Sequence, residues 1–287
     1  MVPAIFRTIE EARRTWENIV RYRYRLLKQY EGHYSTLPYS AIPPVLATRH
    51  AKVEKVIGAF NTSLIASVLG AETAAFHVLK AQHLTATITL STLFYRDELA
   101  YDAFIAQFKE IISHCQSVIE ISMRDRTNRA RLGFSFDLGI IWPLYIVACK
   151  CRHPVVRRKA IALLPKSNLE GLWDGRAMAA IGQWAMDLEE DDGAKNDDQF
   201  IPEERRLRLI ALLTNRNNKT AQPISCTRSS DGILHYVGAT VHWGEATDIA
   251  STSGKVRNPA TGVEELLEYW INNWRSYIED IPSLPDE

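Results

Sequence analysis

Apolar residues recur every three or four positions over long stretches of this chain, and this spacing is the feature that most restricts its fold. The longest unbroken series begins near Asp97 and comprises Tyr101, Phe104, Phe108, Ile111, Cys115, Val118 and Ser122. Burial of a large apolar side chain is worth about 1.5–3 kcal/mol, so this face alone contributes roughly 10–15 kcal/mol before chain entropy is subtracted. The spacing predicts a long amphipathic helix.

Similar spacing predicts helices over most of the first 213 residues. A capping box from Thr8 to Glu11 starts the first helix, and Gly32 ends it. Its inward face contains one charged residue, Arg23, whose aliphatic stem can lie along apolar surface. Further helices are expected at about 49–69, 71–94, within 138–150, from Pro154, after the capping residue Asp174, and at 203–213.

The hydrophobic period changes to two in residues 224–243. There, ISCTRSS and ILHYVGATVHW flank Asp231-Gly232, which predicts a β-hairpin with a tight primed turn. One face of its second strand is expected to carry Ile233, His235, Val237, Val241 and Trp243. A final helix is predicted at 263–278.

These elements predict an all-α array or bundle with a small C-terminal β-hairpin. Glycine makes up only 14 of 287 residues, which also favours helices over turn-rich sheets. The whole chain, 1–287, is expected to form a single domain. Its sub-regions are a helical N-terminal half (8–122), motif-bearing helices (134–213), the hairpin (224–243) and the C-terminal helix (263–278).

Composition narrows the function classes. Lys plus Arg equals Asp plus Glu at 34 each, whereas a free-standing domain that binds nucleic acid usually has a basic excess. Four cysteines are too few for a disulfide framework of the small secreted kind. The longest uncharged apolar run, LGIIWPLYIVAC, has 12 residues against the roughly 20 of a spanning helix, and the N-terminus lacks a signal-peptide run. We therefore expect no membrane span and a reducing compartment, the nucleus or the cytoplasm.

The sequence contains no recognised catalytic, phosphate-binding or metal-binding motif. Cys149-x-Cys151 lacks a second pair at zinc spacing, and the pairs His77 with His83 and His235 with His242 are not expected to share a face. Asp137 with Lys150, or His114 beside Cys115, form possible acid–base pairs that the spacing does not support. We therefore assign no catalytic, cofactor-binding or metal-ligating residue and expect a protein that is not an enzyme.

Charge is distributed unevenly along the chain. Five cations and no acid lie between Lys150 and Lys159, whereas residues 187–198 contain seven acids and one lysine and are predicted to form a solvated loop. The basic segment is either a patch for nucleic acid or nuclear import, or a solvated helix face paired with acids of the same chain. The second interpretation is favoured, with Arg157 and Arg158 binding acids of residues 187–192.

Two segments together form an ordered pattern. They are FSFDLGIIWPLYIVACKCRHPVVRRKAIALL at 134–164 and EGLWDGRAMAAIGQWAMDLEE at 170–190. The pattern resembles the C-terminal part of the fungal-specific regulatory region of zinc binuclear cluster transcription factors. The matching positions are Phe134, Gly139, Pro143, Leu144, Tyr145, Lys150, Cys151, Arg152, Pro154, Arg157, Arg158, Ala160, Leu163, Leu164, Glu170, Gly171, Trp173 and Asp174.

The resemblance implies a fungal-type transcription regulator, such as one that controls a metabolic gene cluster. Members of that family hold two zinc ions with six N-terminal cysteines, an array that these four cysteines do not form, so no zinc ligand or DNA-contacting residue carries over. Direct nucleic-acid binding is therefore doubtful. The expected partners are proteins: the transcription machinery, a DNA-binding partner or a second copy of the chain in a homodimer. The chain is then a shortened paralogue, an incomplete gene model or a partner-dependent regulator.

Two other classes of function remain open. One is an enzyme or accessory protein of a biosynthetic gene cluster, which requires a polar pocket with convergent titratable groups. The other is a non-catalytic scaffold or dimerisation module.

Overall fold

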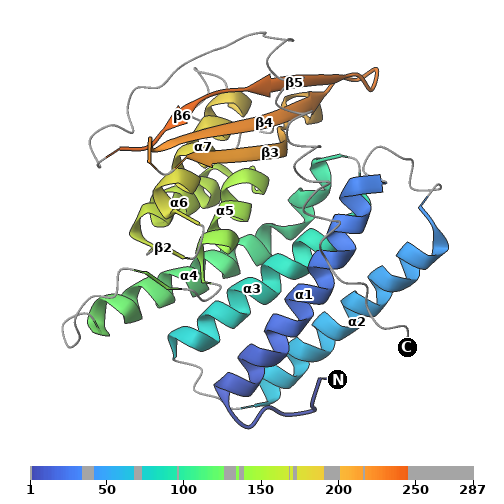
Figure 1. Ribbon diagram of the computed structural model, residues 1–287, viewed down its shortest axis with the longest axis vertical. Helices are drawn as coiled ribbons and strands as arrows, with labels where there is room; N and C mark the ends of the chain where they lie inside the picture. The colour runs from blue at the N-terminus through green and yellow to red at the C-terminus, as the bar shows by residue number, and fades with distance from the viewer. Residues whose placement is uncertain are drawn as a thin grey trace.

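The computed structural model describes residues 2–33, 42–67, 73–95, 97–125, 134–135, 139–167, 169–170, 173–190, 201–215 and 217–244 (Figure 1). Within these ranges the chain is mainly helical, with a small antiparallel sheet near residues 208–242. The predicted fold class is therefore confirmed. The predicted helix at 263–278 lies outside the described residues.

The α-helices are α1 (Ile9–His33), α2 (Pro44–Ala66), α3 (Ala74–Ser91), α4 (Ile105–Asp125), α5 (Ile141–Lys150), α6 (Pro154–Leu163) and α7 (Gly175–Glu189). Short 3-10 helices are η2 (Leu99–Phe104), η3 (Leu164–Lys166) and η4 (Glu203–Arg205). The main sheet contains β3 (Arg208–Asn215), β4 (Thr220–Arg228), β5 (Leu234–Gly238) and β6 (Val241–His242). Two short strands, β1 (Phe134–Ser135) and β2 (Leu169–Glu170), pair in parallel.

Local sequence signals set several helix starts. The backbone N–H of Glu11 donates to Thr8 Oγ1 at 3.1 Å, and the Glu11 carboxylate accepts from the Arg7 N–H at 2.8 Å. Asp174 caps α7 by accepting from two backbone N–H groups, and Pro154 is the first residue of α6. These side chains satisfy N–H groups that have no partner inside a helix, so they fix where each helix begins.

The buried side chains form two clusters. One lies between α1, α2 and the inner face of α3, where the rings of Trp16 and Phe60 are 4.9 Å apart. The other lies among α3 to α7 and extends to the sheet, which covers the α7 end of the molecule (Figure 1). Arg23 belongs to the buried face of α1, and its Nη1 donates to Thr89 Oγ1 at 3.0 Å.

The helix predicted at 203–213 is wrong. Only Glu203–Arg205 forms a 3-10 turn, and residues from Arg208 onward form β3, which pairs antiparallel with β4. A short apolar run such as LIALL fits a buried strand as well as a helix, and pairing with β4 decides between them. Among the described residues of the motif-bearing region 134–213, the last α-helix ends at Glu189.

The predicted hairpin is present as β4 and β5, but its turn differs from the prediction. Gly232 N–H donates to Ser229 O at 2.8 Å, and Ser229 N–H donates to Ile233 O at 2.9 Å. Among the described residues only Lys219 and Gly232 have positive φ, so Asp231 lacks the left-handed conformation that a two-residue type I′ turn requires. The loop is the three-residue kind, with glycine in the left-handed position.

The second strand of the hairpin does not present one continuous face. Ile233 and His235 are exposed, whereas Val241 and Trp243 are buried. The chain leaves β5 after Gly238 and resumes as β6 at Val241, so the alternation is interrupted between the two strands. The prediction of five residues on one face is wrong for this reason.

Candidate functional site

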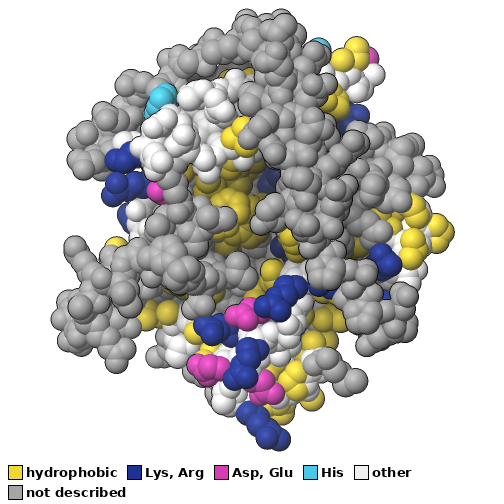
Figure 2. Space-filling view, in the orientation of Figure 1, with side chains coloured by type: hydrophobic (Ala, Val, Ile, Leu, Met, Phe, Trp, Pro, Cys, Tyr) yellow, Lys and Arg dark blue, Asp and Glu magenta, His cyan; other side chains and the backbone are white. Residues whose placement is uncertain are grey.

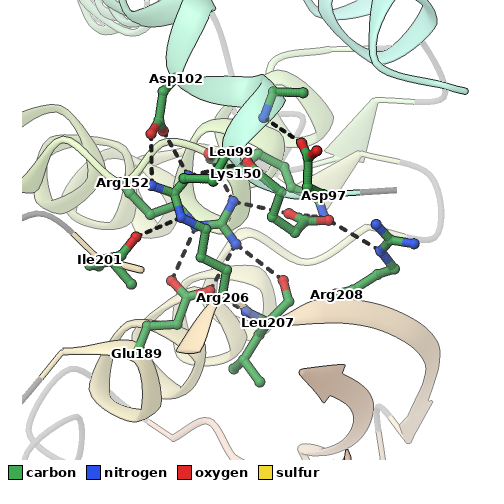
Figure 3. Close-up of polar contacts among 12 residues, drawn as sticks. Asp97, Leu99, Asp102, Lys150, Arg152, Glu189, Ile201, Arg206, Leu207 and Arg208 are labelled. Atoms are coloured by element: carbon green, nitrogen blue, oxygen red, sulfur yellow. Dashed lines mark hydrogen bonds and ion pairs between the residues drawn. The ribbon is translucent and has the colours of Figure 1, made fainter. Parts of the chain in front are cut away.

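The cations of the 134–190 pattern converge on a buried group of charges (Figure 3). We call this group the ionic cluster. Its members come from η2 and the residue before it, from the end of α5 and the residues that follow, from α6, from α7 and from the start of β3. They are Glu98, Asp102, Lys150, Arg152, Arg157, Glu189, Arg206 and Arg208.

Arg152 lies at the centre of the ionic cluster, with its side chain only 3% exposed. Its Nη1 donates to Glu98 Oε2 at 3.0 Å, and its Nη2 and Nε donate to the two oxygens of Glu189 at 2.8 and 3.3 Å. The backbone carbonyls of Lys150 and Leu207 accept from the same guanidinium at 3.0 and 3.1 Å. The Nε, Nη1 and Nη2 atoms of the planar guanidinium are thus all engaged as hydrogen-bond donors.

Glu189, near the end of α7, is fully buried. Besides Arg152, it contacts Arg157 Nη1 at 2.6 Å and accepts from the backbone N–H of Leu207 at 2.6 Å. The prediction of a solvated acidic loop from residue 187 is therefore wrong at its start, because the carboxylate of Glu189 is needed inside to balance two guanidiniums. Residues 191–198 lie outside the described residues.

Glu98 is the second buried carboxylate of the ionic cluster. Both of its oxygens accept from Lys150 Nζ at 2.8 Å, and Oε1 lies 3.5 Å from Arg208 Nε. Burial by itself would raise the pKa of Glu98, but the charges of Lys150 and Arg152 outweigh it and lower the pKa to about 2. Burial would likewise lower the pKa of Arg152, and the carboxylates of Glu189 and Glu98 raise it instead. These groups stay ionised around neutral pH, so they are not set to exchange protons there.

Side chains of the segment before β3 form hydrogen bonds that hold this segment to η2 and to the residue before it. Arg206 donates to the two oxygens of Asp102 at 2.8 and 2.7 Å, and to the backbone carbonyl of Ile201 at 2.8 Å. In return, the Glu203 carboxylate accepts from the backbone N–H groups of Glu98 and Leu99, at 2.8 to 3.1 Å. The ionic cluster thereby fixes the position of the sheet relative to the helices.

The preferred interpretation of the basic segment is confirmed in part. Arg157 binds Glu189 and Arg158 binds Glu190, as predicted for acids of the same chain. The segment is solvated only in part, however, because Arg152 and Arg157 are buried, whereas Arg158 and Lys159 reach solvent. Helix α1 also carries charges of both signs on its surface. Lys and Arg side chains alternate with Asp and Glu over its lower part (Figure 2), and Arg13 lies 3.7 Å from Glu17.

The histidine contacts in the structure differ from the pairs considered in the sequence. His83 is buried, whereas His77 Nδ1 lies 2.8 Å from His114 Nδ1 on α4. His235 and His242 are exposed on the sheet. In the sequence, His114 was paired only with the adjacent Cys115. Its contact with His77 was not predicted, because the two positions are 37 residues apart in the chain.

The four cysteines are free, and three of them are buried. Burial raises the pKa of Cys149 and raises that of Cys151 to about 11, so both thiols stay protonated near neutral pH. No group of three or more His, Cys, Asp and Glu side chains that could hold a metal ion occurs among the described residues. In the same ranges, no helix combines the length and apolar character needed to cross a membrane. Asp137 lies outside them.

Comparisons with protein-family models, curated proteins and solved structures give no match to this chain. Its interpretation therefore depends on the residue pattern and on the geometry described above.

Proposed function

We propose that this chain is a regulatory module of the fungal transcription-regulator type. It acts in the nucleus by binding proteins, either the transcription machinery or a partner that binds DNA. The observation that carries the proposal is the ordered pattern of residues 134–190, which resembles the fungal-specific regulatory region of zinc binuclear cluster factors.

The positions of these pattern residues in the fold support the proposal. Lys150, Arg152 and Arg157 bind the buried carboxylates of the ionic cluster, and Asp174 caps α7. The ring of Trp173 lies 5.3 Å from that of Trp142 in the core. Each of these residues holds elements of the fold together. A protein-binding module needs a rigid fold to present its binding surface. A pattern of residues that stabilises the fold meets this need.

A reporter assay tests the proposal. The full chain is fused to a heterologous DNA-binding domain, and transcription is compared with that domain alone at equal protein level. We expect a change of several-fold in reporter output and a nuclear signal for a fluorescently tagged copy of the unfused chain. No change in transcription, together with a tagged copy that stays outside the nucleus, would contradict the proposal.

Neighbouring valines of α6 provide a matched control. Val156 is 5% exposed and Val155 is 51% exposed. Val156→Asp places an unpaired charge in the core and should abolish the reporter change. Val155→Asp adds an acid to the exposed first turn of a helix, where a negative charge is tolerated, and should retain the change. If both fusions keep full activity, the folded module is not the active part and the proposal is wrong.

A further inference from the structure

Strand β5 lies at the outer edge of the main sheet and pairs along one side only (Figure 1). Its partner there is β4, in antiparallel register, and no second strand pairs with β5 within the described ranges. An edge strand presents a row of backbone N–H and C=O groups to which another extended chain can bind. The free side of β5 is therefore a possible binding surface, and its geometry shows which partner fits it.

The register determines which backbone groups of β5 point away from β4. Ser229 N–H donates to Ile233 O at 2.9 Å, directly beyond the last paired residues of the two strands. At the other end, Ala239 N–H donates to Pro223 O. Hydrogen-bonded positions alternate along an antiparallel pair, so the odd-numbered residues of β5 bond to β4. The residues whose N–H and C=O groups point outward are Leu234, Tyr236 and Gly238.

The composition of this edge does not oppose pairing with another strand. Residues 233–242 read ILHYVGATVH and contain no charged residue and no proline. Ile233 is 56% exposed and Tyr236 is 48% exposed. Native proteins commonly protect an exposed edge strand with lysine or proline, because either one prevents a second chain from pairing there. Since β5 carries neither, its edge is suited to binding an extended chain.

We propose that β5 pairs antiparallel with β5 of a second copy of this chain, across a twofold axis at Tyr236. With Tyr236 opposite itself, Leu234 of each copy lies opposite Gly238 of the other. Every outward-pointing N–H and C=O group of the two strands then has a partner, because hydrogen-bonded positions of one strand meet hydrogen-bonded positions of the other. Any other register leaves at least one of these residues without a partner in the second β5.

The side chains that meet across the axis favour a second copy over a foreign strand. On one face the two Tyr236 rings lie side by side, and an aromatic pair at directly opposite positions is stabilising. Leu234 has room because the residue opposite is Gly238. On the other face His235 lies opposite the uncharged Val237, so like charges do not meet. The formal net charge of +0 at pH 7 also removes long-range repulsion between two copies.

The size of the contact sets the expected strength of the dimer. Pairing of one short strand buries less area than the roughly 1,200–2,000 Å² of a standard stable interface. We therefore expect reversible association with a dissociation constant of about 1–100 µM. This inference does not rest on the proposed function, because the dimer follows from the sheet edge alone.

Sedimentation equilibrium of the purified full chain tests the pairing. We expect monomer on dilution and dimer at high concentration. Tyr236→Lys should weaken self-association by about tenfold or more, because two lysines would face each other across the axis. Tyr236→Glu should have the same effect, and an equimolar mixture of the two variants should associate more strongly than either alone. The control is Ile65→Lys, which changes a side chain on α2 that is 61% exposed and should leave association unchanged.

Hydrogen exchange of the wild-type amides tests the same surface without a variant. The outward amides of Leu234, Tyr236 and Gly238 should exchange more slowly when the protein concentration is raised, because the second copy accepts their hydrogen bonds. The amides of His235 and Val237 already bond to β4, so their exchange should depend less on concentration.

Three outcomes would overturn the proposal. The first is a wild-type chain that stays monomeric at every concentration, which would leave the edge for a strand of another protein. The second is a dimer that Tyr236→Lys does not weaken, with unchanged circular dichroism, which would assign the dimer to another surface. The third is exchange of the outward amides that does not depend on concentration, which decides the matter even if the variants fail to fold. No measurement here involves transcription, so failure of the dimer and failure of the proposed function are distinguishable.

Discussion

At the scale of single residues, Gly175 and Gly58 show how far the effect of one methyl group depends on its surroundings. An ideal Cβ at Gly175, the first residue of α7, would lie 2.1 Å from the backbone oxygen of Leu164. An ideal Cβ at Gly58 in α2 would meet nothing within 4 Å. Alanine is therefore excluded at the first position by backbone that cannot move aside, and it is tolerated at the second.

We expect Gly175→Ala to lower the free energy of unfolding by about 2 kcal/mol or more, because the overlap displaces α7 from η3. Gly58→Ala should raise the free energy of unfolding by about 0.5–1 kcal/mol, since alanine restricts the unfolded chain. Urea unfolding of the two variants measures both effects. Equal stabilities would show that α7 does not approach Leu164 as closely as described.

His83 is a buried histidine between aromatic rings. Its ring centroid lies 6.1 Å from that of Trp16 and 6.5 Å from that of Phe60. Burial, together with the charge of Lys80, lowers its pKa from 6.5 to about 4. The unfolded chain therefore binds more protons than the native protein between these values, and stability falls as the pH falls from 6.5 to 4.

We expect His83→Phe to remove a large part of this decrease, on the order of 3 kcal/mol, since phenylalanine keeps the ring stacking and has no proton to bind. His77 and His114, whose pKa values are also lowered, retain some dependence in the same range. Urea unfolding at pH 7, 6, 5 and 4 gives the slope for wild type and variant. Parallel slopes would mean that the pKa of His83 is the same in the native and the unfolded chain.

At the scale of elements, the end of α7 contains two adjacent glutamates with different surroundings. Glu189 is fully buried between Arg152 and Arg157, whereas Glu190 pairs with Arg158, which is 41% exposed. The same Glu→Gln change at these two positions therefore compares the loss of a buried ion pair with the loss of an ion pair near the surface.

Glu189→Gln should destabilise the protein by about 3–5 kcal/mol, because it removes the carboxylate that binds the buried Arg157 and leaves Arg152 to share Glu98 with Lys150. Glu190→Gln should cost less than about 1 kcal/mol, because solvent screens its pair. Thermal or urea unfolding compares the two. A difference below about 1 kcal/mol between the variants would contradict the central place given to Glu189.

Local signals in the sequence predicted the starts of α1, α6 and α7, whereas α2 begins at Pro44 and not near residue 49 as expected. Long-range pairing decided the other features that the sequence missed. Thr8, Pro154 and Asp174 act within four residues of themselves, so their roles follow from spacing. The pairs of Arg157 and Arg158 were predictable because runs of opposite charge lie near each other in the chain. Glu98 and Arg206 were missed. Nothing local marks a carboxylate whose nearest partner in the chain, Lys150, is 52 residues away, or an arginine that binds Asp102 across 104 residues. The strand β3 was missed because its partner β4 determines its conformation.

At the scale of the whole molecule, the ionic cluster ties acid stability to the arrangement of helices and sheet. Two of its carboxylates have lowered pKa values: that of Glu98 is about 2 against 4.5 in the unfolded chain, and that of Glu189 is lowered too. A lowered carboxyl pKa contributes stability above about pH 4.5 that is lost as the pH falls toward 2.

We expect the free energy of unfolding to decrease steeply between pH 4.5 and 2. The dependence on pH in this range should be shallower in Glu98→Gln, which is less stable at neutral pH. Urea unfolding across the range, followed by circular dichroism, measures it. A wild-type free energy that stays constant between pH 4.5 and 2 would show that Glu98 is not ionised against Lys150 and Arg152.

The connection between Glu98 and Arg206 has a consequence for the newly made chain. Arg206 follows Glu98 by 108 residues, so a ribosome adding about 5–20 residues per second releases it roughly 5–20 s later. During that interval Asp102 lacks the guanidinium of Arg206, and the N-terminus of η2 lacks its cap from Glu203. The helices made earlier therefore lack these contacts until residues 203–206 and the sheet that follows them have been synthesised.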